Sequence, residues 1–151
     1  MLAFMRVVYL ASVWLHLLAA MTWTGGMVAF VVLVMPYFRG QPEPARQAFL
    51  EWFGPRFERV SWICLGILAA TGTFNLWVRG VQPSDFFRAE WRATSFGQLL
   101  QWKLGLVALV TILSATHART GSQAQARWLG RVLLVCGLAI VALAVSLVRA
   151  I

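Results

Sequence analysis

Four side chains are candidates for chemistry because they are polar and lie within or beside long apolar stretches: His16, Asn75, Lys103 and His117. Imidazole nitrogens bind transition metals, while an ammonium or amide group can pair with an anion or donate a hydrogen bond. Such groups are costly in lipid and mark functional sites by default. The same stretches contain no Asp or Glu, which argues against a carboxylate proton relay or an acid–base pair.

The elements that position these residues follow from the composition. The chain has 151 residues, of which 60% are apolar and 12% charged, against about 25% charged in a typical soluble domain. Four apolar runs, 7–35, 60–78, 96–118 and 128–148, can each supply the roughly 20 helical residues that a bilayer requires. The sequence therefore predicts an all-α integral membrane protein, a single transmembrane domain over 1–151 that forms an up-down-up-down four-helix bundle.

The sequence of the first loop predicts a further helix, which we expect to lie flat in the membrane interface. Pro36 closes the first apolar run, and Gly54-Pro55 ends an amphipathic segment over 44–53. The apolar residues of this segment recur at helical spacing: Ala45, Ala48, Phe49, Trp52 and Phe53.

Helix ends are marked by serine followed three residues later by glutamine, the spacing of a capping box. Ser95 with Gln98 marks the start of the third helix, and Ser122 with Gln125 the start of the fourth. Gly121 marks the end of the third, so the last two helices should form an antiparallel hairpin.

The net charge of +8 comes almost entirely from arginine. Because the arginines lie between and beside the apolar runs, they match anionic lipid headgroups rather than nucleic acid. The first and third loops carry seven of them and the remaining segments five. This bias places both termini outside the cytoplasm.

Depth estimates bring several polar groups together. At about 1.5 Å per residue, His16, Thr71, Lys103 and Asn75 lie roughly 15, 12, 9 and 6 Å below the same surface. Four polar groups from three helices can therefore meet in one half of the bundle. Structural alternatives stay open: His16 hydrogen-bonded across helices to Thr71, Lys103 reaching the interface, and Asn75 joining two helices.

Two metal chemistries remain open. His117 lies near the opposite surface, about 15 Å from the depth of His16, so a single haem held between the two histidines is disfavoured. A Cu(I) site could use methionine and cysteine; Cys64 and Cys136 share a depth, and the first helix contains Met21, Met27 and Met35.

Several short motifs resemble the copper-resistance protein D (CopD) family. They are the strings over 16–26 (HLLAAMTWTGG), 71–75 (TGTFN) and 101–104 (QWKL), followed by His117. The start of the first helix and the Lys-to-His third helix are also similar to HemJ-type protoporphyrinogen oxidases. The first loop and the beginning of the second helix lack the usual HemJ signature, so that activity is not carried over.

The resemblance implies that His16, Lys103 and His117 occupy the family's polar positions in the prokaryotic cytoplasmic (inner) membrane. The leading hypothesis is a haem b protein with His16 as iron ligand. Lys103 would be the second ligand or the partner of a propionate, and His117 would belong to a second site or a partner interface. The alternatives are copper uptake, with His and Met or Cys as ligands, and an accessory subunit of a larger respiratory or photosynthetic complex. The sequence leaves enzymatic activity and homo-oligomer formation open.

Overall fold

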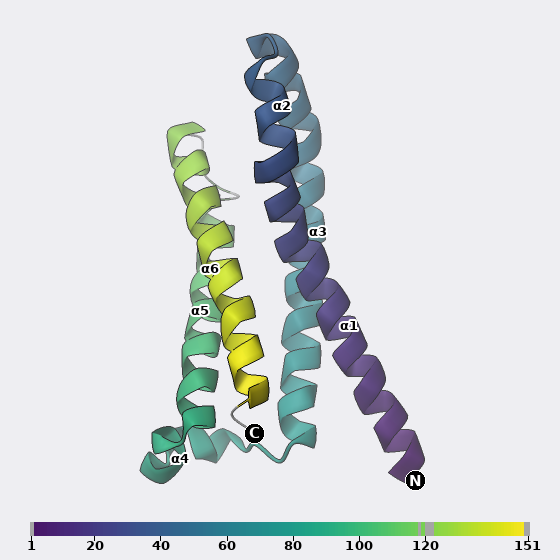
Figure 1. Ribbon diagram of the computed structural model, residues 1–151, viewed down its shortest axis with the longest axis vertical. Coiled ribbons are helices and arrows are strands. Elements are labelled where there is room, and N and C mark those ends of the chain that lie inside the picture. The colour runs from purple at the N-terminus through teal and green to yellow at the C-terminus, as the bar shows by residue number, and fades with distance from the viewer. Residues whose placement is uncertain (1, 118, 120–122, 150–151) are drawn as a thin grey trace. The chain divides into compact units, whose positions relative to one another are not determined.

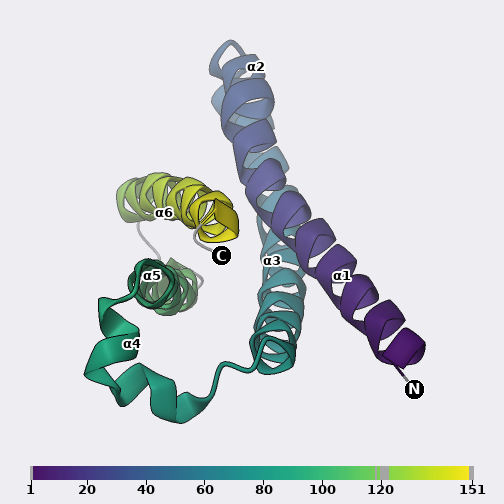
Figure 2. The same ribbon diagram turned by 60° about the horizontal axis from the view of Figure 1, so that its bottom comes forward.

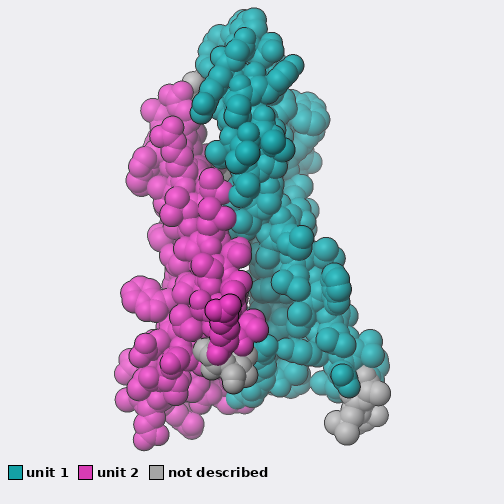
Figure 3. Space-filling model, viewed as in Figure 1, with its two compact units in different colours: residues 1–80 teal, residues 81–151 magenta. Residues whose placement is uncertain are grey.

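A computed structural model describes residues 2–117, 119 and 123–149. It divides the chain into two compact units, residues 1–80 and 81–151, each built around two long helices (Figures 1 and 3). All regular structure in the described residues is helical: α1 (Leu2–Ala29), the π-helix η1 (Phe30–Val34), α2 (Met35–Arg39), α3 (Glu43–Val78), the 3₁₀ helix η2 (Pro83–Phe87), α4 (Ala89–Ala93), α5 (Ser95–His117) and α6 (Gln123–Arg149).

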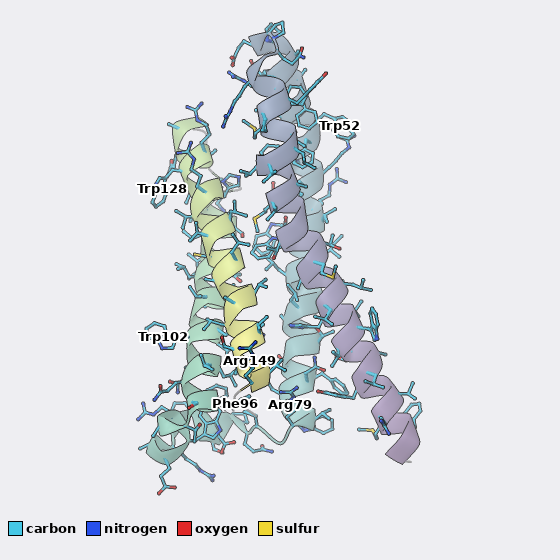
Figure 4. The ribbon with its side chains drawn as sticks, viewed as in Figure 1. Trp52, Arg79, Phe96, Trp102, Trp128 and Arg149 are labelled. Carbon is cyan, nitrogen blue, oxygen red and sulfur yellow. The ribbon has the colours of Figure 1, made fainter. Side chains whose placement is uncertain are left out.

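Four helical stretches are long and apolar enough to cross a bilayer, as the sequence predicts. They cover residues Phe4–Arg39, Glu43–Val78, Ser95–His117 and Ala124–Arg149. Large apolar side chains on them are exposed, among them Leu33 and Val148, at 69% and 71%. Tryptophans also extend away from their helices, as Trp52, Trp102 and Trp128 show in Figure 4. Surfaces of this kind fit lipid rather than water.

The prediction that Pro36 closes the first helix is wrong. Helical backbone continues through α1, η1 and α2 to Arg39. Proline removes a backbone donor, and its ring clashes with the carbonyl of the preceding turn in an α-helix. The π-turn immediately before Pro36 widens that turn, and the N–H of Met35 bonds the carbonyl of Phe30 five residues back. The wider turn accommodates the proline without ending the helix.

The predicted break at Gly54-Pro55, and with it a separate helix over 44–53, is also wrong. The amphipathic segment and the second span form one helix, α3, of 36 residues with Pro55 inside it. Arg56 supports the proline turn, since its Nη1 donates a 2.8 Å hydrogen bond to the Trp52 carbonyl. Its guanidinium also lies 4.5 Å from the centre of the Trp52 ring.

The apolar stripe of the first loop packs on the preceding helix, and this explains why α3 does not break. Phe49, Phe53 and Phe57 stack along α3 with ring centroids 5.4 Å apart at each step. Phe53 stacks on Phe30 at 5.1 Å, and Phe49 on Phe38 at 4.4 Å. Each such pair contributes about 0.5–1.5 kcal/mol beyond its burial. The four pairs together contribute about 2–6 kcal/mol, which is of the same size as the roughly 3 kcal/mol that proline costs in a helix interior.

Gly26 provides a test of this packing, because it lies against Phe57. A Cβ at Gly26 would come 2.7 Å from Cε2 of Phe57, whereas one at Gly25 would meet nothing within 4 Å. The Phe57 ring is held in the stack and cannot turn aside without disturbing Phe53. We expect Gly26→Ala to be less stable in detergent than the matched Gly25→Ala by about 1–2 kcal/mol. Thermal unfolding of both variants checks this, and equal melting temperatures would contradict the close approach.

The second unit is the expected hairpin of α5 and α6, which run side by side (Figure 2). The third span is predicted to within one residue at its start, but its N-cap is Thr94, not Ser95. The Thr94 hydroxyl accepts a 3.0 Å hydrogen bond from the Gly97 N–H and donates one of 2.6 Å to the Trp91 carbonyl. The threonine thus satisfies the backbone N–H of Gly97, which has no partner within the helix, and this is the usual action of an N-cap. The predicted signals at Gly121 and Ser122, and the predicted end at residue 118, lie outside the described residues.

Candidate functional site

His16 lies on α1 and contacts Thr71 of α3. This hydrogen bond between helices is the structural alternative that the sequence left open for His16. Nδ1 of His16 is 2.8 Å from Oγ1 of Thr71, and Thr71 is buried. Gly72 provides room for the ring, since a Cβ there would come 3.4 Å from Cε1 of His16. The two helices therefore hold the imidazole in one position.

The hydrogen bonds of Thr71 determine the tautomer of His16. The threonine hydroxyl donates its one hydrogen to the carbonyl of Ile67, at 2.6 Å, so its oxygen accepts a hydrogen from Nδ1 of His16. A neutral imidazole with its proton on Nδ1 carries its lone pair on Nε2. Metal-ligating histidines commonly donate their other ring N–H to an oxygen acceptor, which fixes the ring and raises its basicity. The arrangement thus suits a metal ligand that binds through Nε2.

Asn75 lies one turn beyond Thr71 on α3 and belongs to a short polar ladder between α1 and α3. At the outer end of the ladder, Nε and Nη2 of Arg79 each lie 3.3 Å from the Tyr9 hydroxyl. Between Arg79 and Thr71, Oδ1 of Asn75 is buried and has no hydrogen-bond partner within the described part of the chain, and the same is true of Oγ of Ser12. The ladder therefore has two direct contacts, Tyr9 with Arg79 and His16 with Thr71, and the helix register puts Ser12 and Asn75 at the level between them.

Sequence reasoning misses Tyr9 and Ser12. They precede His16 by seven and four residues, so all three lie on one face of a helix. That spacing was a usable signal, but a tyrosine and a serine in an apolar helix are individually unremarkable. Only the pairing of α1 with α3 brings the Tyr9 hydroxyl within hydrogen-bond distance of Arg79.

Lys103 and His117 lie in the second unit, on α5, whereas His16 and Asn75 lie in the first. The fourteen residues between Lys103 and His117 separate their levels by about 21 Å along the helix. His117 is the last residue of α5, and its Nδ1 is buried with no hydrogen-bond partner among the residues that the structure describes. The structure therefore pairs His16 with Thr71, with Asn75 one turn further along the same helix, while the convergence of Asn75 and Lys103 with His16 stays a prediction.

Metal-ligand clusters of the usual kind are not found in the described part of the chain. No three His, Cys, Asp or Glu side chains there are grouped closely enough to hold a metal ion. Cys64 and Cys136 are both buried free thiols, one on α3 and one on α6. A metal held by His16 would therefore need at least one further ligand of another kind, such as a methionine thioether or a cofactor ring.

Comparison with known proteins identifies the family. A protein of Aquifex aeolicus (strain VF5), described as uncharacterized, is 29% identical over 156 residues, which is 95% of this chain and 96% of that protein. No solved structure matches the chain. The family model described as copper resistance protein D matches residues 51–147, a segment that includes Asn75, Lys103 and His117 but begins after His16. Because this match covers more than half of a chain with four membrane-spanning helices, the protein is a multi-pass membrane protein that belongs to the copper resistance protein D (CopD) family.

Proposed function

We propose that this protein binds a haem b in the prokaryotic cytoplasmic membrane and that His16 is an iron ligand. The observation that carries the proposal is the hydrogen bond from Nδ1 of His16 to Thr71, whose own hydroxyl hydrogen is on the Ile67 carbonyl. It directs the imidazole lone pair to Nε2 and holds the ring against Gly72. A neutral, oriented imidazole is the donor that haem iron takes in many proteins.

The remaining polar residues take roles around this ligand. Lys103 is the second ligand or the partner of a haem propionate, and Asn75 is a hydrogen-bond donor near the same surface. His117 belongs to a second site or to a partner interface. Haem would supply one-electron transfer, while the protein would supply the axial ligand and a water-poor surrounding that set its potential. The arginine distribution supports an orientation with both termini outside the cytoplasm.

Copper handling is the second candidate, and the family match favours it, because the matching model is described as copper resistance protein D. His16 again offers the clearest nitrogen ligand. A Cu(I) site would combine His16 with methionine or cysteine sulfur as its other ligands; no three His, Cys, Asp or Glu side chains are grouped together in the described residues.

Visible absorption spectra of the detergent-purified protein, first oxidised and then reduced with dithionite, separate the two candidates. We expect a Soret band and, on reduction, sharp α and β bands, with about one iron per chain by metal analysis. A featureless spectrum from cells supplied with ample haem would refute the haem assignment. Copper bound after loading with Cu(I) would then favour the second candidate. If the protein binds neither iron nor copper, a structural role remains.

A further inference from the structure

At the middle level of the polar ladder, two buried polar atoms have no hydrogen bond to any described residue. Oγ of Ser12 and Oδ1 of Asn75 are both buried and neither has a partner among the described residues. A buried polar group left unpaired costs about 1–3 kcal/mol. Two such groups at one level of a helix pair are therefore unfavourable unless something polar joins them.

The levels on either side fix where these two groups lie. The contact between Tyr9 and Arg79 and the hydrogen bond between His16 and Thr71 set the antiparallel register of α1 against α3. Ser12 follows Tyr9 by about one helical turn, and Asn75 precedes Arg79 by about one turn. The two unpaired groups thus belong to the same level, between the outer pair and His16.

Toward its N-terminus α1 leans away from the C-terminal end of α3, as Figures 1 and 2 both show. The long side chains of Tyr9 and Arg79 still reach each other there, at 3.3 Å. Serine and asparagine have shorter side chains, and neither Oγ of Ser12 nor Oδ1 of Asn75 has a hydrogen-bond partner among the described residues.

We propose that water binds at the level of Ser12 and Asn75 and links His16 to the membrane surface at Tyr9 and Arg79. A buried water commonly makes about three hydrogen bonds to groups that are otherwise unsatisfied. One or two waters here would satisfy the Ser12 hydroxyl and the Asn75 carbonyl. They would also complete a hydrated path, about two helical turns long, from the surface to the imidazole.

This inference goes beyond the proposed function, because it requires no cofactor at His16. It assigns Ser12 and Asn75 as water ligands and Tyr9 with Arg79 as the outer end of the path. Arg79 is exposed at the end of α3 (Figure 4). Water and protons from that surface would thereby gain access to a histidine that otherwise lies within an apolar helix pair.

Water-edited solid-state NMR tests the site directly. The full chain, with ¹⁵N-labelled histidine and without added haem or copper, is reconstituted in lipid bilayers, and magnetisation transfer from water to the imidazole nitrogens is timed. A His117→Gln variant assigns the remaining signal to His16. We expect rapid transfer to Nδ1 of His16, slowed several-fold by Ser12→Val or Asn75→Leu.

Thr73→Val is the matched control, because Thr73 lies on α3 between Thr71 and Asn75 but is exposed and bonds the Ala69 carbonyl of its own helix. This variant should leave the transfer rate unchanged. Transfer in the wild type as slow as in Asn75→Leu would overturn the proposal.

A milder substitution gives a second readout if the bulkier variants fail to fold. Ser12→Ala removes the hydroxyl without adding bulk. If the level is hydrated, the change removes a hydrogen bond to water and lowers the melting temperature. If the level is dry, the change removes an unpaired polar group and raises the melting temperature, which would refute the water site.

Discussion

Replacing His16 by alanine is expected to abolish the absorbance of bound haem, whereas His117→Ala should retain it. His16 is the histidine whose ring is oriented by a neighbouring helix, through Thr71. His117 lies in the other unit, at the end of α5, and we assign it to a second site or to a partner interface. Pyridine haemochrome assay of the purified variants measures the haem bound per chain. Full haem content in His16→Ala would rule out His16 as the ligand.

Substitutions at Thr71 separate ligation from helix packing. Thr71→Val keeps the shape of the side chain but removes the oxygen that accepts the Nδ1 hydrogen of His16. Loss of such a supporting hydrogen bond typically weakens metal binding by about 10–100-fold. Thr71→Ser retains the oxygen and should bind nearly as tightly as the wild type. If valine and serine at this position have equal affinities, the hydrogen bond has no role in binding.

The presence of four helices long and apolar enough to cross a bilayer could be predicted, because length and hydrophobicity alone determine it. The start of α5 was predicted to within one residue, since the apolar run and its polar flank coincide there. Helix ends were predicted poorly, because each proline was taken to end the helix in which it occurs. At Pro36 a π-turn absorbs the proline, and at Pro55 the stacked phenylalanines keep α3 continuous. Such long-range packing is not visible in a local pattern.

The candidate site was predictable only in part, for a related reason. Depth along a helix can be counted from the sequence, and this counting placed His16 near Thr71, where the structure has a hydrogen bond. The register of one helix against another cannot be counted in the same way. Ser12 and Asn75 become a pair only once Tyr9 and Arg79 are seen in contact. Chemistry that depends on two short side chains at one level therefore requires the structure.

Gly97→Ala is expected to destabilise the second unit strongly, because there is no room for a methyl group at the start of α5. A Cβ at Gly97 would lie 2.2 Å from the carbonyl oxygen of Trp91 and 3.0 Å from Oγ1 of Thr94. That carbonyl cannot move freely, since it accepts hydrogen bonds from both the N–H and the hydroxyl of Thr94. Any shift that relieves the clash breaks the N-cap of α5.

The two costs add, and they exceed the gain in helix propensity. Overpacking costs about 1–3 kcal/mol and loss of the cap about 1 kcal/mol, against about 1 kcal/mol gained when alanine replaces glycine in a helix. Thermal unfolding in detergent should show a melting temperature lower by about 5 °C or more. Gly105→Ala is the matched control, because it lies on the same helix and a Cβ there meets nothing within 4 Å. Equal melting temperatures for the two variants would show that the tight turn between α4 and α5 does not fix the start of the third span. A lower melting temperature for Gly97→Ala alone would show that this start requires a residue without a side chain.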